Sequence, residues 1–130
     1  MSEFSKSLSV TASALRAQAT RLRHVSENIS NADTPGYRRK IVPFEVNRAE
    51  NAGIDMVKVG RVNLDRSELN EIYDPSHPLA NDAGNFKGSN VDLMIEIADA
   101  REAQRSYEAN LKMFEQVRQM SSSLMDLLRK

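Results

Sequence analysis

Two histidines stand close to acidic residues, and these positions are the ones most suited to acid–base or metal chemistry. His24 precedes Glu27 by three residues, so the two side chains share one face if the segment is helical. A protein zinc site needs three or four ligands, and the chain contains no cysteine. We therefore expect a solvated or interhelical hydrogen-bonding pair rather than a metal site.

The second histidine, His77, lies in the segment "DPSHP" near Asp74 and Asp82. A His–Asp pair suits general acid–base catalysis, but the sequence has no serine in a nucleophile elbow and no glycine-rich phosphate loop. The flanking prolines instead favour a rigid turn with His77 hydrogen-bonded to the backbone. The sequence therefore predicts no enzyme, with no catalytic residue, no metal and no cofactor.

Basic residues gather in the runs "RLRH" and "YRRK" within an otherwise neutral chain of 18 basic and 18 acidic residues. Residues 1–41 hold seven Lys and Arg against three Asp and Glu. A nucleic-acid module carries a denser basic cluster than this. We expect no nucleic acid partner, and we expect these cations to contact acidic neighbours.

The elements that position these residues begin with a predicted helix over residues 4–30. Apolar residues recur at alternating spacings of four and three, which is a heptad seam. Its strongest positions are Leu8, Leu15, Leu22 and Ile29, and between them lie Phe4, Thr11, Gln18 and Val25. The two polar positions, Thr11 and Gln18, weaken the seam but can fix its register.

A second helix is predicted over residues 91–128, with Ser89 or Asn90 as its N-cap and Asp92 in its first turn. One four-three stripe comprises Leu93, Ile97, Ala100, Gln104, Tyr107, Leu111 and Phe114. A second stripe then takes over, at Met113, Val117, Met120, Leu124 and Leu127. A stripe that moves around the helix favours contact with several neighbours.

Residues 41–73 predict short strands, with Pro43 placing the first at an edge. Residues 74–90 are rich in Pro, Gly, Asn and Asp, which predicts an irregular connection rather than a strand or helix. Aromatic residues make up only 5% of the chain, so we expect its burial to be completed by oligomerisation. No apolar run is long enough for a membrane helix, and the N-terminus lacks a secretory signal pattern.

The junction between the first helix and the strands is the segment "ISNADTPGYRRK". Asn31 suits the left-handed conformation that ends many helices. Residues 34–37 predict a type II turn, because Pro35 fixes φ at its second position and Gly36 supplies a positive φ at its third. Asp33 is disfavoured by the helix dipole, so we expect it to bond to a neighbouring N–H or cation.

Two motifs at opposite ends of the chain carry a family resemblance. "VSENISNADTPGYRRK" resembles the N-terminal signature of bacterial flagellar rod and hook proteins, N-A-x-T-P-G-Y after an amphipathic helix. The C-terminal helix resembles that of the same family, with its R-x-Y-E-A-N core at residues 105–110. "IYDPSHPLANDAGNF" is similar to the Y-D-P-x-H-P segment of the family's proximal rod members, although Asn85-Phe86 and Gly88-Ser89 depart from the common pattern.

The resemblance implies a structural subunit of the flagellar basal-body rod, the drive shaft that transmits motor torque for motility. It implies export through the flagellar type III apparatus without a cleaved signal peptide, and self-assembly in the periplasm. The implied partners are copies of the chain, other rod proteins and the export apparatus, with no nucleic acid and no direct membrane insertion. The alternatives are another axial rod or hook component and, more distantly, a small helical membrane-surface or enzymatic protein.

The expected fold is mainly α and elongated, with long N- and C-terminal helices paired as an antiparallel coiled coil around a small β-rich insert. The expected divisions are 1–40 for the first helix and motif, 41–90 for the insert and 91–130 for the second helix. The predicted assembly residues lie on the helix seams, the turn and the C-terminal motif: Leu8, Leu15, Leu22, Ile29, Asn31, Pro35, Gly36, Tyr37, Tyr107, Asn110, Leu111, Met113, Val117, Met120, Leu124 and Leu127.

Overall fold

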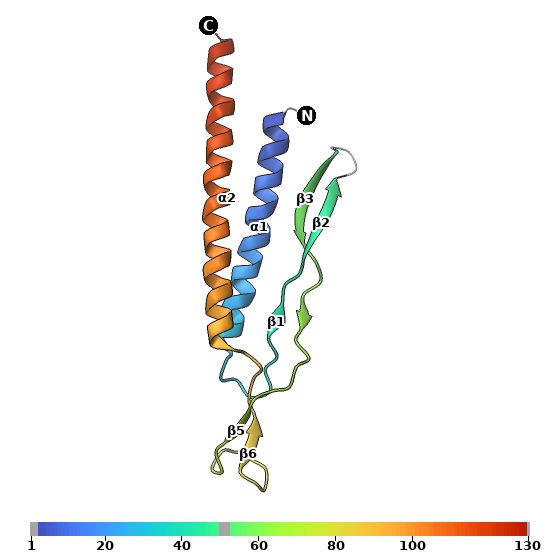
Figure 1. Ribbon diagram of the computed structural model, residues 1–130, viewed down its shortest axis with the longest axis vertical. Coiled ribbons are helices and arrows are strands. Elements are labelled where there is room, and N and C mark those ends of the chain that lie inside the picture. Colours follow the sequence, from blue (N-terminus) through green and yellow to red (C-terminus); the bar gives the residue numbers. More distant parts are fainter. Residues whose placement is uncertain (1–2, 50–52, 130) are drawn as a thin grey trace.

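Two long antiparallel helices dominate the structure, a computed structural model that describes residues 3–49 and 53–129. Helix α1 spans Glu3–Ser30 and α2 spans Leu93–Leu128, as their periodicity predicts. At 1.5 Å per residue they are roughly 42 and 54 Å long. The N-terminus of α1 and the C-terminus of α2 lie at the same end of an elongated molecule (Figure 1), and neither helix is long and apolar enough to cross a membrane.

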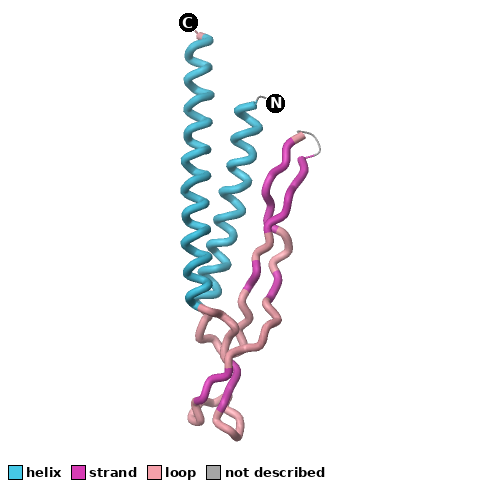
Figure 2. The backbone as a smooth tube through the Cα atoms, in the orientation of Figure 1, coloured by secondary structure: helices cyan, strands magenta, loops and turns pink. Residues whose placement is uncertain are grey.

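Between the helices, the described residues form three two-stranded antiparallel ribbons (Figure 2). The first pairs β1 (Lys40–Ile41) with β4 (Asn63–Leu64), and the second pairs β2 (Phe44–Ala49) with β3 (Ile54–Val59). These two ribbons continue each other as one arm, residues 40–49 and 53–64, which runs beside α1 (Figure 1). Pro43 separates β1 from β2, as expected for a residue that cannot donate a backbone hydrogen bond.

The third ribbon forms the tip of the molecule at the end away from both termini (Figure 1). It pairs β5 (Glu71–Tyr73) with β6 (Asn85–Lys87). The predicted strand in "LNEIY" is therefore confirmed. The prediction that residues 74–90 contain no strand is wrong at β6, because pairing with β5 imposes an extended conformation on a sequence of low strand propensity.

Helix α1 is the middle layer, since it contacts α2 on one side and β3 on the other. Small residues let the arm approach it closely: Ser13 and Ala17 are buried, and Ser13 Oγ accepts a hydrogen bond of 3.1 Å from the backbone N–H of Val57. All eight seam residues predicted on α1 are buried or half-buried. The helix pair is antiparallel and in contact.

The face of α2 that is shielded from solvent differs from the predicted one. Four members of the first predicted stripe are exposed, namely Leu93, Ile97, Gln104 and Leu111. The buried or half-buried positions instead recur with spacings of four and three at Glu96, Ala100, Ala103, Tyr107, Asn110, Phe114, Val117 and Ser121. The first predicted stripe is therefore confirmed at Ala100, Tyr107 and Phe114 and wrong at its other four members. In the first turn the buried position belongs to a polar residue, Glu96.

The N-cap of α2 is Asp92, not Ser89 or Asn90 as predicted. Its carboxylate accepts a hydrogen bond of 3.0 Å from the backbone N–H of Met94 and satisfies one of the free donors of the first turn. Ser89 and Asn90 instead bond to the corner after α1, at Ala32 and Arg39.

Candidate assembly site

The corner after α1 is a tight turn that returns the chain toward the arm. The N–H of Tyr37 bonds to the carbonyl of Thr34 at 3.1 Å, and Gly36 has a φ of 77°. These features confirm the predicted turn, in which Gly36 supplies the positive φ. The left-handed conformation predicted for Asn31 is wrong, since no non-glycine residue among those described has a positive φ.

Asn31 ends the helix through its side chain rather than through its backbone conformation. Its Nδ2 donates to the carbonyl of Glu27 at 2.9 Å, so it satisfies an acceptor of the last helical turn. Its Oδ1 accepts from the hydroxyl of Thr34 at 3.1 Å, which ties the helix end to the turn. Asp33 is exposed, and nothing in the structure explains its acidic side chain.

A polar cluster with two buried members, Asn28 and Glu96, lies where the corner, the arm and the start of α2 meet. We call it the junction network, and its members are Asn28, Tyr37, Arg39, Lys40, Asp65, Asn90 and Glu96. Asn28 is fully buried and uses its amide completely. Its Nδ2 donates to the Lys40 carbonyl and to Glu96 Oε2, at 3.1 and 3.2 Å, and its Oδ1 accepts from the Tyr37 hydroxyl and the Lys40 N–H, both at 2.8 Å.

Glu96 is the buried charge of the junction network, with 0% exposure in the first turn of α2. Arg39 Nε donates to its Oε1 at 2.6 Å, a length typical of charge-assisted hydrogen bonds. Arg39 also lies 3.5 Å from Asp65 and 3.8 Å from Asp99. Burial disfavours the charged guanidinium, but the hydrogen bonds and charges of Glu96 and Asp65 together outweigh it, so the pKa of Arg39 is raised.

The segment before α2 completes the junction network. Asn90 Oδ1 accepts from the N–H of Arg39 at 2.7 Å, and Asn90 Nδ2 donates to the Asp65 carbonyl at 2.9 Å. Ser89 donates its hydroxyl to the carbonyl of Ala32, and the N–H of Gly36 bonds to the carbonyl of Gly88 at 3.0 Å. Three stretches distant in the sequence, near residues 28–40, 65–67 and 88–99, are thereby joined at one point.

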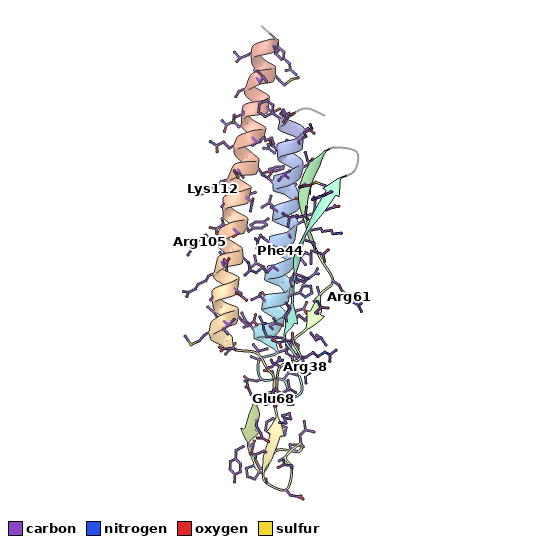
Figure 3. The ribbon with its side chains drawn as sticks, turned by 45° about the vertical axis from the view of Figure 1, so that its right-hand side comes forward. Arg38, Phe44, Arg61, Glu68, Arg105 and Lys112 are labelled. Carbon is purple, nitrogen blue, oxygen red and sulfur yellow. The ribbon has the colours of Figure 1, made fainter. Side chains whose placement is uncertain are left out.

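The cations of "YRRK" all have polar partners within the chain: Arg39 and Lys40 pair with carboxylates, and Arg38 donates to backbone carbonyls. Arg38, at the base of the arm (Figure 3), donates to the carbonyls of Asp65 and Ser67 at 3.2 and 2.9 Å. Lys40 forms an ion pair with Glu27, and the hydrogen bond between them lowers the pKa of Glu27. Burial raises the pKa of the Tyr37 hydroxyl. These three cations have partners within the chain, and their contact with other subunits stays a prediction.

The two histidines have structural surroundings. His24 lies 3.5 Å from Glu27, but its side chain is only 11% exposed, so the solvated alternative is wrong. His77 Nδ1 accepts from the N–H of Leu79 at 3.1 Å, and its ring stacks on Phe86 at a centroid distance of 3.9 Å. The predicted turn with a backbone-bonded His77 is therefore confirmed. Within residues 3–49 and 53–129, no three His, Asp or Glu side chains are grouped as a metal site.

Eight of the predicted assembly residues lie on α2, and five of them are exposed. Met113, Met120, Leu124 and Leu127 are exposed, and we call these four the α2 stripe. Leu111 is also exposed, whereas Val117, Tyr107 and Asn110 are half-buried on the side toward α1. Asn110 Nδ2 donates to the carbonyl of Ser106 at 2.8 Å, within the helix. Arg105 and Lys112 point outward from α2 (Figure 3).

The other predicted assembly residues, on α1 and the corner, have different surroundings. Leu8, Leu15, Leu22 and Ile29 are half-buried along α1. Pro35 and Gly36 are exposed at the turn, and Tyr37 is engaged with Asn28. Asn28, Asn90 and Glu96 were not predicted as a cluster. One signal was available, since Glu96 interrupts the apolar residues 93–97 of the first turn.

Comparison with known proteins places this architecture in a family. The family model described as "Flagella basal body rod protein" matches residues 8–38, and that described as "Flagellar basal body rod FlgEFG protein C-terminal" matches residues 82–127. A flagellar basal-body rod protein FlgC from Agrobacterium fabrum is 44% identical over 99% of this chain and 98% of its own. The chain belongs to the FlgC family of flagellar basal-body rod proteins.

Two more distant FlgC proteins agree with this assignment. That of Bacillus subtilis is 38% identical over 81% of this chain and 85% of its own length. That of Escherichia coli is 37% identical over 85% of this chain and 87% of its own. The family membership confirms the resemblance drawn from the terminal motifs and from "YDPSHP", and it confirms the prediction of a structural protein rather than an enzyme.

Proposed function

We propose that this chain is a structural subunit of the bacterial flagellar basal-body rod. The observation that carries the proposal is the match to FlgC along essentially the whole chain. We further propose that the chain is exported by the flagellar type III apparatus without a cleaved signal. It then assembles in the periplasm with copies of itself and other rod proteins into the shaft that transmits torque.

The exposed surface of α2 supports a role in assembly. The four apolar side chains of the α2 stripe are between 45% and 66% exposed. In contrast, the buried apolar residues among those described are only Ala17, Val25, Val91 and Ala103. A folded chain with so small a core gains stability when neighbours cover its apolar surface. The α2 stripe is therefore proposed as a contact with adjacent subunits.

The helix pair is proposed to work as an antiparallel coiled coil. The seam of α1 and the four-three spacing of shielded positions on α2 suit packing of this kind. We propose that the divisions of the chain at residues 40 and 90 correspond to two layers of the rod. The helices form the inner layer and residues 41–90 form the outer layer. The junction network would then connect the two layers.

Torque transfer requires a stiff connection between these layers. The hydrogen bonds of the junction network support the proposal that it provides this connection. Its buried donors and acceptors are mutually satisfied, and such networks hold one arrangement because any other leaves a polar group unpaired. With no cysteine in the chain, no disulfide contributes. We therefore propose that the network fixes the angle between the helix pair and the arm.

A second candidate is another axial component of the rod or hook. The observation that favours it is the C-terminal family model, which is named for FlgE, FlgF and FlgG. The relatives that match along most of the chain are FlgC proteins, so the rod subunit remains the first proposal.

Deletion of the gene with imaging of isolated basal bodies tests the function. We expect cells without rods and without motility, and we expect a plasmid copy of the gene to restore both. Intact rods in motile deletion cells would contradict the proposal. Rods that lack only a distal segment or hook would favour the second candidate.

A further inference from the structure

The tip of the molecule, defined as residues 71–87, contains the "YDPSHP" segment and carries two large exposed side chains. It projects beyond the helices at the end away from both termini (Figure 1). Tyr73 is 72% exposed and Leu79 is 62% exposed, so the helices and the arm leave both uncovered. Exposed aromatic and apolar side chains that are gathered in one place mark sites of protein association.

Tyr73 is exposed but held in position. A Cβ at Gly84 would lie 2.9 Å from both Tyr73 Cε2 and Pro75 Cγ, so the edge of the ring and the proline close over this glycine. The N–H of Asp74 bonds to the carbonyl of Gly84 at 2.9 Å and fixes the backbone beside the ring. A side chain that is already placed loses little conformational entropy on binding, which makes Tyr73 suited to anchor a partner.

The loop that carries Leu79 is fixed through His77. The N–H of Leu79 donates to His77 Nδ1 at 3.1 Å, and the imidazole ring stacks on Phe86 of β6. The N–H of His77 bonds in turn to the carbonyl of Asp74 at 3.0 Å. These contacts tie the loop to the ribbon, so Leu79 is presented on a rigid support rather than on a free loop.

The far end of the tip is acidic. Glu71 lies opposite Lys87 in the ribbon, so these two charges offset each other. The tip also holds Asp74 and Asp82 and has no further Lys or Arg. Asp82 is exposed. A partner that meets this end therefore needs Lys or Arg at its rim, because like charges brought together at an interface are costly.

Part of the tip lies outside the segments that the family models match. The first model ends at residue 38 and the second begins at residue 82, so β5 and the loop over residues 74–81 belong to neither. The two helices lie largely inside these models and can supply packing that rod proteins have in common. The tip can then distinguish one neighbour from another.

We propose that the tip is a docking knob that enters a socket on a different axial protein, with Tyr73 and Leu79 as its anchors. The socket has an apolar floor that receives the anchors and Lys or Arg at its rim that meets Asp82. The inference rests on the proposed function, because it names how the subunit selects a neighbour in the rod. Tyrosine is enriched among the residues that dominate binding energy at interfaces.

Two tips are poor partners for each other. Contact between the tips of two copies would bring the exposed Asp82 side chains together, and neither tip offers a free cation to pair with them. Such a contact would also be isologous and would close as a dimer. A basic socket on another protein has neither disadvantage.

Photo-cross-linking in assembled rods tests the proposal. Tyr73 is replaced by p-benzoylphenylalanine, which keeps an aromatic ring at the anchor position, and the variant is expressed in deletion cells. Isolated basal bodies are irradiated, and the adducts are identified by mass spectrometry of their peptides. We expect one principal adduct, to a protein other than this chain, through a peptide that contains Lys or Arg. The same probe at Leu79 samples the contact if the first variant fails to assemble.

A charge reversal with a matched control tests the rim. Asp82→Lys, combined with the probe at Tyr73, should lower the yield of adduct by at least about tenfold, because it places a cation against the cations of the socket. Glu68→Lys makes the same change of charge at an exposed position outside the tip, near the base of the arm (Figure 3), and should leave the yield unchanged.

Three results would overturn the proposal. The first is adducts only with a second copy of this chain. The second is an adduct peptide without Lys or Arg. The third is an equal loss of adduct in Asp82→Lys and Glu68→Lys, because the effect would then belong to net charge and not to the tip.

The outcomes also separate this inference from the proposed function. If deletion removes the rods but assembled rods give no adduct from either probe position, the docking knob is wrong and the rod function stands. If deletion leaves intact rods, the rod function is wrong, and the inference that rests on it fails with it.

Discussion

Replacing Glu96 by Gln is the most informative single change to the junction network. The side chain is fully buried and accepts from two donors, Arg39 Nε at 2.6 Å and Asn28 Nδ2 at 3.2 Å. Glutamine keeps the shape but has one acceptor oxygen, so one donor would face an NH₂ group. The change also removes the buried negative charge that is paired with Arg39.

The expected cost follows from these contacts. Breaking a buried ion pair typically costs 3–5 kcal/mol, and a hydrogen bond to a charged group is worth about 1.5–3 kcal/mol. Arg39 is 22% exposed and keeps Asp65 and Asp99 as neighbours, which offsets part of the loss. We therefore expect Glu96→Gln to lower the free energy of unfolding by about 2–4 kcal/mol.

Urea unfolding of the purified chain, followed by far-UV circular dichroism, measures this change. The matched control is Glu102→Gln, because Glu102 lies on the same helix and contacts Arg21 at 3.5 Å, but its side chain is 69% exposed. An exposed pair of this kind is worth at most about 1 kcal/mol. If Glu96→Gln costs no more than Glu102→Gln, the junction network does not stabilise the fold as argued.

Three further predictions concern the corner, the seam and acid stability. Gly36→Val should lower the free energy of unfolding by about 1–2 kcal/mol, because Gly36 has a φ of 77° that valine disfavours. Nothing lies within 4 Å of an added Cβ, so backbone strain is the whole cost, and thermal unfolding measures it. Leu22→Asp should lower the free energy of unfolding by about 3 kcal/mol or more, because it places a charge in the seam, and it should abolish rods in complemented cells. Ala19→Asp, at an exposed position of the same helix, should have neither effect. The hydrogen bond from Lys40 lowers the pKa of Glu27 in the folded state. The stabilisation that ionised Glu27 gives to the fold is therefore present above the ordinary carboxyl pKa of about 4.3 and is lost as the pH falls through the lowered pKa. Glu27→Gln should weaken the dependence of the urea midpoint on pH in that window.

Each of these predictions has an outcome that contradicts it. Gly36→Asn is the control for the turn, because asparagine tolerates positive φ better than valine does; equal losses for both would remove backbone strain as the cause. Normal rods and motility in Leu22→Asp would refute the seam assignment. An unchanged pH dependence in Glu27→Gln would mean that the Lys40 ion pair contributes nothing to folding.

The helices were predictable from the sequence because their signals are local. The seam of α1 recurs every three or four residues from Phe4 to Ile29, and no Gly or Pro interrupts it before Pro35. The turn at Gly36 was equally local, since Pro and Gly each restrict or permit specific φ values. Such features need no knowledge of distant partners.

The missed features all depend on contacts between distant segments. Strand β6 is defined by its pairing with β5, and its own residues give no strand signal. The shielded face of α2 was placed wrongly because periodicity identifies apolar stripes but not which of them meets α1. In the sequence, Glu96 is only a charge among the apolar residues 93–97. Its burial follows from its contacts with Arg39 and Asn28, 57 and 68 positions away.

The central claim is that the junction network is folded in the free subunit, whereas the C-terminal part of α2 becomes stably ordered only when neighbouring subunits contact it. Hydrogen exchange, compared between the purified chain and isolated rods, tests this directly. We predict that amides of residues 28–40 are protected in both samples, whereas those of residues 113–128 gain protection only in rods. Equal protection of residues 113–128 in the free chain and in rods would contradict the account.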